Sequence, residues 1–164
     1  MTVSIDALKD ASYYAEQVMD KAVIRGKFTR GDLQVRLNTW VAATANTVVA
    51  EFTSNKACKI KLDLWSPQGN TSVNSSGNKN GVQWVTRSFE NTPLLAWPCH
   101  VAIAMKVLNG SASNENVVSL LPDKTVTVAL TLNTNFDKKE WKEQTITDAV
   151  LTTSTSINKL RYAH

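Results

Sequence analysis

The side chains best suited to catalysis or metal binding are few in this sequence. Its cysteines are Cys58 and Cys99, and its histidines are His100 and His164. Cys99 and His100 are adjacent in an expected strand, where neighbouring side chains point to opposite faces of the sheet. They could therefore neither act together as nucleophile and base nor share a metal ion. We interpret His100 as a structural histidine and the cysteines as buried thiols, with a disulfide between them as the alternative.

Acidic residues and known motifs do not supply an active site either. Asp137, Glu140 and Glu143 are interleaved with lysines, as is typical of a solvated helix face. Glu51 and Asp63 belong to different expected strands and could pair only if the fold brings them together. The sequence has no phosphate-binding glycine loop, zinc motif or nucleophile elbow. We expect no enzyme, no cofactor and no metal, while a site made of scattered polar residues stays open.

The basic residues form a pattern that could bind nucleic acid. The candidate residues are Arg25, Lys27, Arg30, Arg36, Trp40, Lys59 and Lys61. Those that belong to one expected strand recur at steps of two or four residues, and so share a face of that strand. If all these strands line one surface, their charges could hold phosphates and the indole of Trp40 could stack on a base. The alternative is a solvated sheet face on which lysines protect an edge strand.

Alternation of polar and apolar residues predicts several β-strands. The clearest segment is 57–65, in which Cys58, Ile60, Leu62 and Leu64 point one way and the residues between them the other. Further strands are expected at 35–42, 47–53, 81–89, 100–109, 124–133 and 145–157. The segment Ser66–Asn80 is rich in Gly, Ser and Asn, and is expected to be a long loop.

Two helices are also expected. Residues 1–26 place apolar side chains at three- and four-residue steps, with Ser4 as a possible N-cap and Gly26 as a stop. A short helix over 136–144 would be capped by Asp137, with Glu140 three residues later.

These elements predict a mainly β protein with a single domain over residues 1–164. Its parts would be an N-terminal amphipathic helix at 1–26 and a β-sandwich or jelly-roll-like body at 33–164. A two-layer α+β fold, with the first helix on a sheet, is the alternative. The chain has 164 residues, 43% of them hydrophobic, and a net charge of +4, so it can bury a core without disulfides or metals. We expect neither a signal peptide nor a membrane span.

The layout resembles that of small RNA-virus coat proteins: a short, basic, all-β domain rich in Thr, Asn and Ser, with an N-terminal extension and no active site. This resemblance implies a self-assembling homo-oligomer of many copies that binds RNA non-specifically, does not bind membranes, and occurs in the virion and the host cytoplasm. Many such proteins have a basic N-terminal arm, whereas residues 1–24 here are mildly acidic. RNA contact would then fall to fixed residues such as Arg25, Lys27 and Lys59.

The sequence is also compatible with a second function, that of a binding module. An adhesin-, pilin- or lectin-like β-sandwich could recognise sugar or protein through the Ser66–Asn80 loop and exposed tryptophans. Trp65 precedes that loop and Trp97 lies between two expected strands, and each could instead belong to the core.

Overall fold

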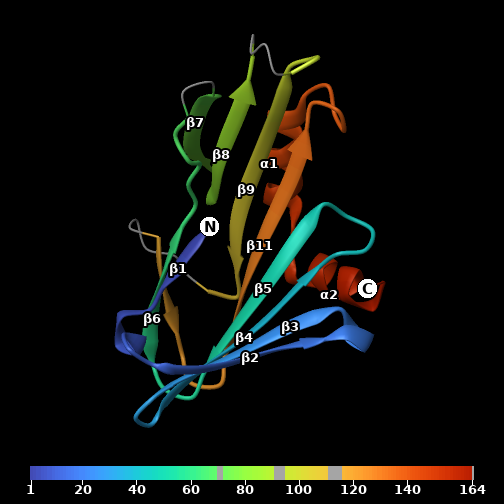
Figure 1. Cartoon of the computed structure of the whole chain (residues 1–164). Helices are drawn as coiled ribbons and strands as arrows, with labels where there is room; N and C mark the ends of the chain where they lie inside the picture. The colour runs from blue at the N-terminus through green and yellow to red at the C-terminus, as the bar shows by residue number, and fades with distance from the viewer. Residues whose placement is uncertain (70–71, 91–94, 111–115, 164) are drawn as a thin grey trace. The chain divides into compact units, whose positions relative to one another are not determined.

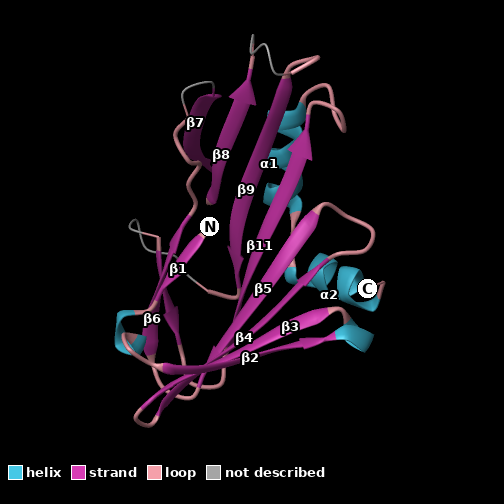
Figure 2. Cartoon of the chain, viewed as in Figure 1, coloured by secondary structure: helices cyan, strands magenta, loops and turns pink. Residues whose placement is uncertain are grey.

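The computed structural model describes residues 1–69, 72–90, 95–110 and 116–163, and it is mainly β, as predicted (Figures 1 and 2). The strands are β1 (Thr2–Ser4), β2 (Ser12–Val18), β3 (Val23–Arg30), β4 (Leu33–Val41), β5 (Thr47–Ser54), β6 (Cys58–Asp63), β7 (Ser72–Lys79), β8 (Val82–Phe89), β9 (Cys99–Leu108), β10 (Val117–Leu120) and β11 (Thr125–Thr134). The helices are α1 (Trp141–Leu151) and α2 (Ser154–Tyr162), and single 3-10 turns form η1 (Asp6–Leu8) and η2 (Met19–Lys21).

The strands form two antiparallel sheets. Hydrogen-bonded neighbours follow the order β2-β3-β4-β5-β11-β9-β8-β7 in an eight-stranded sheet and β1-β6-β10 in a three-stranded sheet. The chain divides into two compact units that both draw on several segments. The first unit comprises residues 1–63, 107–129 and 153–164, and the second comprises 64–106 and 130–152.

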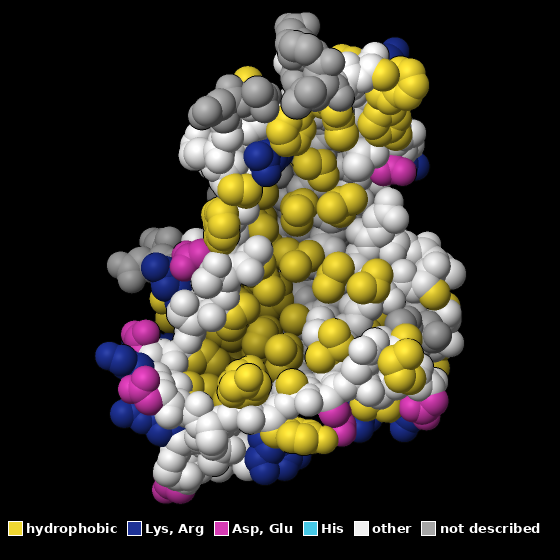
Figure 3. Space-filling view, viewed as in Figure 1, with side chains coloured by type: hydrophobic (Ala, Val, Ile, Leu, Met, Phe, Trp, Pro, Cys, Tyr) yellow, Lys and Arg dark blue, Asp and Glu magenta, His cyan; other side chains and the backbone are white. Residues whose placement is uncertain are grey.

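In the first unit, the three-stranded sheet covers one face of β3, β4 and β5. Its fully buried side chains are Ile60, Leu62, Val118 and Leu120. Val3 is paired with Leu62 across the strands, and it lines an apolar pocket of about 260 Å³ together with Val35 and Leu37 of β4. Figure 3 shows apolar side chains gathered in the hollow between β1 and β5. Burial of this apolar surface holds the two layers together.

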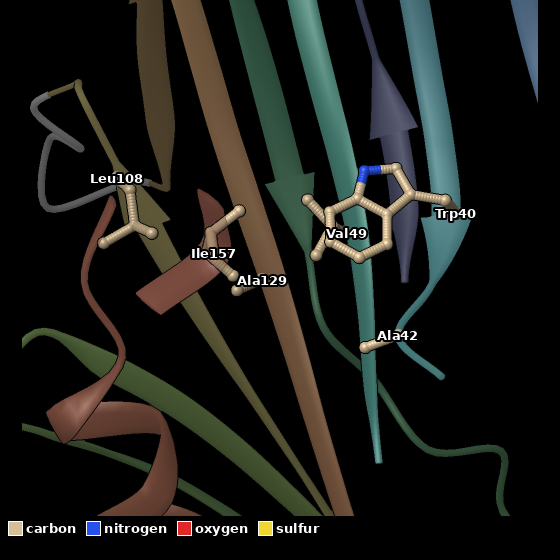
Figure 4. Packing of buried hydrophobic residues seen from close by; sticks show 6 residues of the cluster. All are labelled: Trp40, Ala42, Val49, Leu108, Ala129 and Ile157. Atoms are coloured by element: carbon tan, nitrogen blue, oxygen red, sulfur yellow. The ribbon is translucent and has the colours of Figure 1, made fainter. Parts of the chain in front are cut away.

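The opposite face of the same strands is covered in part by α2. Trp40 of β4 is buried among Ala42, Val49, Leu108, Ala129 and Ile157. In Figure 4 its indole lies beside Val49, and Ile157 of α2 reaches toward Ala129 of β11. The Arg161 guanidinium, one helical turn beyond Ile157, lies 5.6 Å from the Trp40 ring centroid.

In the second unit, α1 packs on β8 and β9. Val82, Ala104 and Ala149 form the buried contact. Lys106 of β9 donates to the carbonyl oxygens of Val150 and Thr152 at 2.5 and 2.7 Å, so its ammonium satisfies acceptors at the C-terminal end of α1.

The ring of Trp84 in β8 leaves no space for a side chain at Gly77 on the neighbouring strand. A Cβ atom at Gly77 of β7 would lie 2.6 Å from the Trp84 ring. The position therefore requires a residue without a side chain. The Lys142 ammonium of α1 lies 4.2 Å from the centroid of the same ring, a cation–π contact.

The predicted N-terminal helix at 1–26 is wrong, because the α-helices of the described ranges are C-terminal and residues 1–26 hold only the single 3-10 turns η1 and η2 beside strands. Residues 12–18 and 23–30 form a hairpin in register from Ser12 opposite Thr29 to Val18 opposite Val23. Ala22 turns the chain at φ 44°. Aromatic and β-branched residues favour strands, and pairing with β4 stabilises the hairpin in a way that local helical periodicity does not reveal.

The strand predicted at 145–157 is also wrong, since α1 and α2 occupy it. Its Thr, Ile and Val content favoured a strand, but Thr145, Ile146 and Ala149 form the buried stripe of α1. The short helix expected over 136–144 begins later, at Trp141, and Asp137 closes the preceding turn instead of capping the helix.

The long loop expected at Ser66–Asn80 contains β7. This strand pairs with β8 from Ser72 opposite Phe89 to Lys79 opposite Val82. It is an edge strand with polar residues on both faces, so its composition resembles that of a loop. The expected alternation was absent because neither face of β7 enters a core.

Candidate nucleic-acid interface

A polar groove lies on the face of β2–β5 that α2 partly covers, within the first unit. Its volume is about 630 Å³. Lys27 of β3 stands directly opposite Arg36 of β4, and Arg25 stands opposite Asn38. Arg161 of α2 also lines the groove. Two strands in register and one helix thus gather four cationic side chains.

Two of these cations are neutralised by glutamates. The Arg25 guanidinium lies 3.5 Å from the Glu16 carboxylate, and Arg161 forms an ion pair and hydrogen bond with Glu51. Both glutamates line the groove as well.

Lys27 and Arg36 have no such partner among the residues that the structure describes. Arg36 Nε donates to Gln34 Oε1 at 3.2 Å, a contact with a neutral amide. Like charges directly opposite each other on neighbouring strands destabilise a sheet. The groove therefore keeps an excess of positive charge where an anion could relieve this repulsion.

Tyr14 of β2 provides an aromatic ring at the groove. Its side chain is 62% exposed, and its hydroxyl donates to Glu16 Oε2 at 3.1 Å. This hydrogen bond, together with the negative charge of Glu16, raises the pKa of Tyr14. The sequence-based prediction missed Tyr14 because it assigned residues 1–26 to a helix. The signal available was the paired aromatics of segment 12–18, which favour a strand.

Trp40, the aromatic residue predicted to stack on a base, is not accessible. It shares the groove face of β4 with Arg36 but is only 3% exposed, beneath α2 and Arg161. Local periodicity could not reveal that a C-terminal helix would cover this position, because residues 145–157 were expected to form a strand.

Arg30, Lys59 and Lys61 lie away from the groove. Arg30 is exposed at the end of β3 and shares the face of Phe28, opposite to that of Arg25 and Lys27. This follows from the three-residue step between Lys27 and Arg30, which reverses the side of the strand.

The two lysines of β6 lie on the outer surface of the three-stranded sheet. Lys59 and Lys61 are exposed and alternate with Ile60 and Leu62, which are buried against the larger sheet. Lys61 also lies 3.6 Å from the carboxylate of Asp63. Of the seven predicted residues, the structure therefore brings Arg25, Lys27 and Arg36 together in the groove and buries Trp40 on the same face. It places Arg30, Lys59 and Lys61 elsewhere.

The other side chains considered for catalysis are His100, Cys58, Cys99, Glu51 and Asp63, and their contacts do not form an active site. The His100 ring stacks on Trp141 with centroids 5.4 Å apart, and its Nδ1 lies 3.9 Å from the Glu90 carboxylate. Cys58 and Cys99 are free thiols. Glu51 and Asp63 each face a cation rather than one another.

Within the described ranges, no group of three or more His, Cys, Asp or Glu side chains could hold a metal ion. None of the helices in these ranges is long and apolar enough to cross a membrane. No family model and no curated protein matches this chain.

Proposed function

We propose that this chain is a non-enzymatic structural subunit, a viral coat protein, that assembles with many copies of itself and binds RNA through the groove. The RNA contact would be non-specific, since cations on a sheet hold phosphates and read no base edges. Its places of action would be the virion and the host cytoplasm, with no membrane partner.

The single observation that carries the RNA part of this proposal is the Lys27–Arg36 pair. These side chains face each other across neighbouring strands, are exposed, and lie in a concave surface. A phosphate between them would convert a repulsion into two charge-assisted hydrogen bonds. Arg25 and Arg161 line the same groove, where they are paired with Glu16 and Glu51.

Tyr14 supports a single-stranded RNA ligand. An exposed ring beside cationic side chains offers a stacking platform for a base while the charges hold the backbone. It takes the role that the sequence-based prediction gave to the buried Trp40.

The experiment is to purify the full chain after expression and to measure particle mass by light scattering together with the 260/280 nm absorbance ratio. We expect large uniform particles that contain nuclease-protected RNA. The double variant Lys27→Gln, Arg36→Gln is expected to lose most of that RNA, because it removes the unneutralised cations of the groove.

The matched control is Lys59→Gln, Lys61→Gln, which removes the same formal charge from the outer surface of the three-stranded sheet. It is expected to retain the RNA of the wild-type protein. Equal losses in both double variants would show that net charge alone matters, and would contradict a role for the groove.

Two exposed tryptophans favour a second candidate, an adhesin-, pilin- or lectin-like binding module. Trp65 is 55% exposed and Trp97 is 65% exposed. Such rings are typical of sugar- and protein-binding surfaces. A monomer without nucleic-acid absorbance that loses binding to a glycan array on Trp65→Ala or Trp97→Ala would favour this module over the coat protein.

A further inference from the structure

One edge of the eight-stranded sheet is open in the first unit. β2 pairs with β3 on one side and has no strand on its other side in the described part of the chain (Figure 1). An edge strand presents a row of unpaired backbone N–H and C=O groups, which can pair with another strand. All seven residues of β2 are paired in register with β3, so no bulge interrupts the strand.

β2 lacks the features by which edge strands normally avoid such pairing. It contains no lysine, no proline and one charged residue, Glu16. Tyr13 and Tyr14 are 76% and 62% exposed. The other edge strand, β7, differs: it is polar, ends in Lys79, and its Asn74 side chain donates to Pro67 O at 2.7 Å in the preceding segment.

The sequence of β2 is complementary to itself in an antiparallel arrangement. With Ala15 on the two-fold axis, all seven residues would find partners, and Tyr14 would stand opposite Glu16 of the second copy. The phenol could donate to that carboxylate, as it does within the chain, where the distance is 3.1 Å. No like charges would face each other, and the small Ala15 side chains would meet at the axis.

We propose that a second copy of this chain pairs with β2 edge to edge, in antiparallel register centred on Ala15. Directly opposite residues of an antiparallel pair lie on the same face. Since Tyr14 and Glu16 belong to the groove face, the grooves of both copies would lie on one side of a continuous sheet. This inference rests on the proposed function only in that the chain assembles with itself.

The first test is chemical cross-linking of Ala15→Cys in the otherwise intact chain with a short bis-maleimide. The expected product is a covalent dimer in which mass spectrometry finds residue 15 joined to residue 15. Asn78→Cys, an exposed position on the other edge strand, is the matched control and should give little dimer. Comparable cross-linking of both variants, or none at position 15, would overturn the proposal.

The second test is the Ala15→Lys variant, which places two ammonium groups opposite each other at the axis. We expect the dimer dissociation constant, measured by light scattering on a dilution series, to rise about fivefold. Asn78→Lys should leave it unchanged, and circular dichroism should show both variants folded.

These tests separate the two proposals. An Ala15→Cys protein that retains RNA but gives no link between residues 15 refutes β2 pairing and leaves the coat function standing. A specific link between residues 15 in protein without RNA supports β2 pairing and counts against RNA packaging.

Discussion

The Asp137 carboxylate closes the turn between β11 and α1. Its Oδ2 accepts hydrogen bonds from the Thr134 backbone N–H at 3.0 Å and from the Thr134 hydroxyl at 2.7 Å. These bonds favour the charged form and lower the pKa of Asp137, with a smaller contribution from Lys138.

The sign of this shift predicts an acid-dependent loss of stability. A carboxyl group whose pKa is lower in the folded state stabilises the fold above its unfolded pKa, which is about 3.9. That contribution is lost as the pH falls through the folded pKa. Asp137→Asn should therefore lower the melting temperature slightly at pH 7, and the difference from wild type should shrink below about pH 4.

Thermal unfolding followed by circular dichroism between pH 3 and pH 7 measures this effect. Glu143→Gln, an exposed change in the first turn of α1, is the control. Identical pH profiles for the two variants would contradict the role of Asp137.

At the scale of the element, α2 connects the core of the first unit to the groove. It begins with a capping box, in which Thr153 Oγ1 accepts from Ser156 N at 3.1 Å and Ser156 Oγ accepts from Thr153 N at 2.8 Å. Ile157 and Arg161 then lie on one face of the helix, four residues apart. The same short helix thus buries Trp40 and holds Arg161 against Glu51.

Loss of this cap should weaken the helix and the packing on Trp40. Thr153→Ala is expected to lower the free energy of unfolding by about 1 kcal/mol, the usual value for an N-cap threonine. Urea unfolding followed by tryptophan fluorescence is the measurement.

Thr155→Ala is the matched control, because this neighbouring threonine is exposed in the first turn of α2. It should leave the unfolding free energy nearly unchanged. A Thr153→Ala protein as stable as the Thr155→Ala protein would show that the capping box contributes little.

The sequence predicted most of the strands in which polar and apolar residues alternate. β4, β5, β6, β8 and β9 each have a face toward a core, and their alternation was visible. β11 is buried on both faces over Val126–Ala129, and its alternation of Thr with apolar residues was visible as well. β2 and β7 are edge strands without a clear buried face, so they lack the alternation of polar and apolar residues that marked the other strands. In β2 the paired Tyr13 and Tyr14 were the remaining strand signal. The residues of α1 were mistaken for a strand because tertiary contacts outweighed their β-branched composition.

At the scale of the whole molecule, the candidate site depends on which strands pair with one another, and the sequence of a single strand does not specify its neighbours. Periodicity predicted a shared face for Arg36 and Trp40, but it placed Arg25 at the end of an expected helix and Lys27 before the first expected strand. Only the pairing of β3 with β4 puts these two residues beside Arg36. Periodicity could not show that Lys59 and Lys61 belong to a different sheet. The sequence therefore predicted that a surface would carry basic side chains, but it did not predict which of those side chains lie together.

If the groove binds RNA as proposed, the affinity should fall as the salt concentration rises. Each phosphate neutralised on a single strand contributes about 0.7 to the slope of log K against log salt. The Lys27→Gln, Arg36→Gln variant should reduce this slope by about 1.4 in titrations of a fluorescent single-stranded RNA. The Lys59→Gln, Lys61→Gln variant should reproduce the wild-type slope, and a reduction there of similar size would contradict the assignment.

The two basic surfaces of the first unit also bear on assembly. Lys27 and Arg36 lie on one outer surface of a two-layer arrangement, while Lys59 and Lys61 lie on the other, with the apolar layer between them. A closed shell has one lining and one exterior, so only one of these surfaces could meet an enclosed genome. If the groove lines the shell, the lysines of β6 are left to face the surrounding solution.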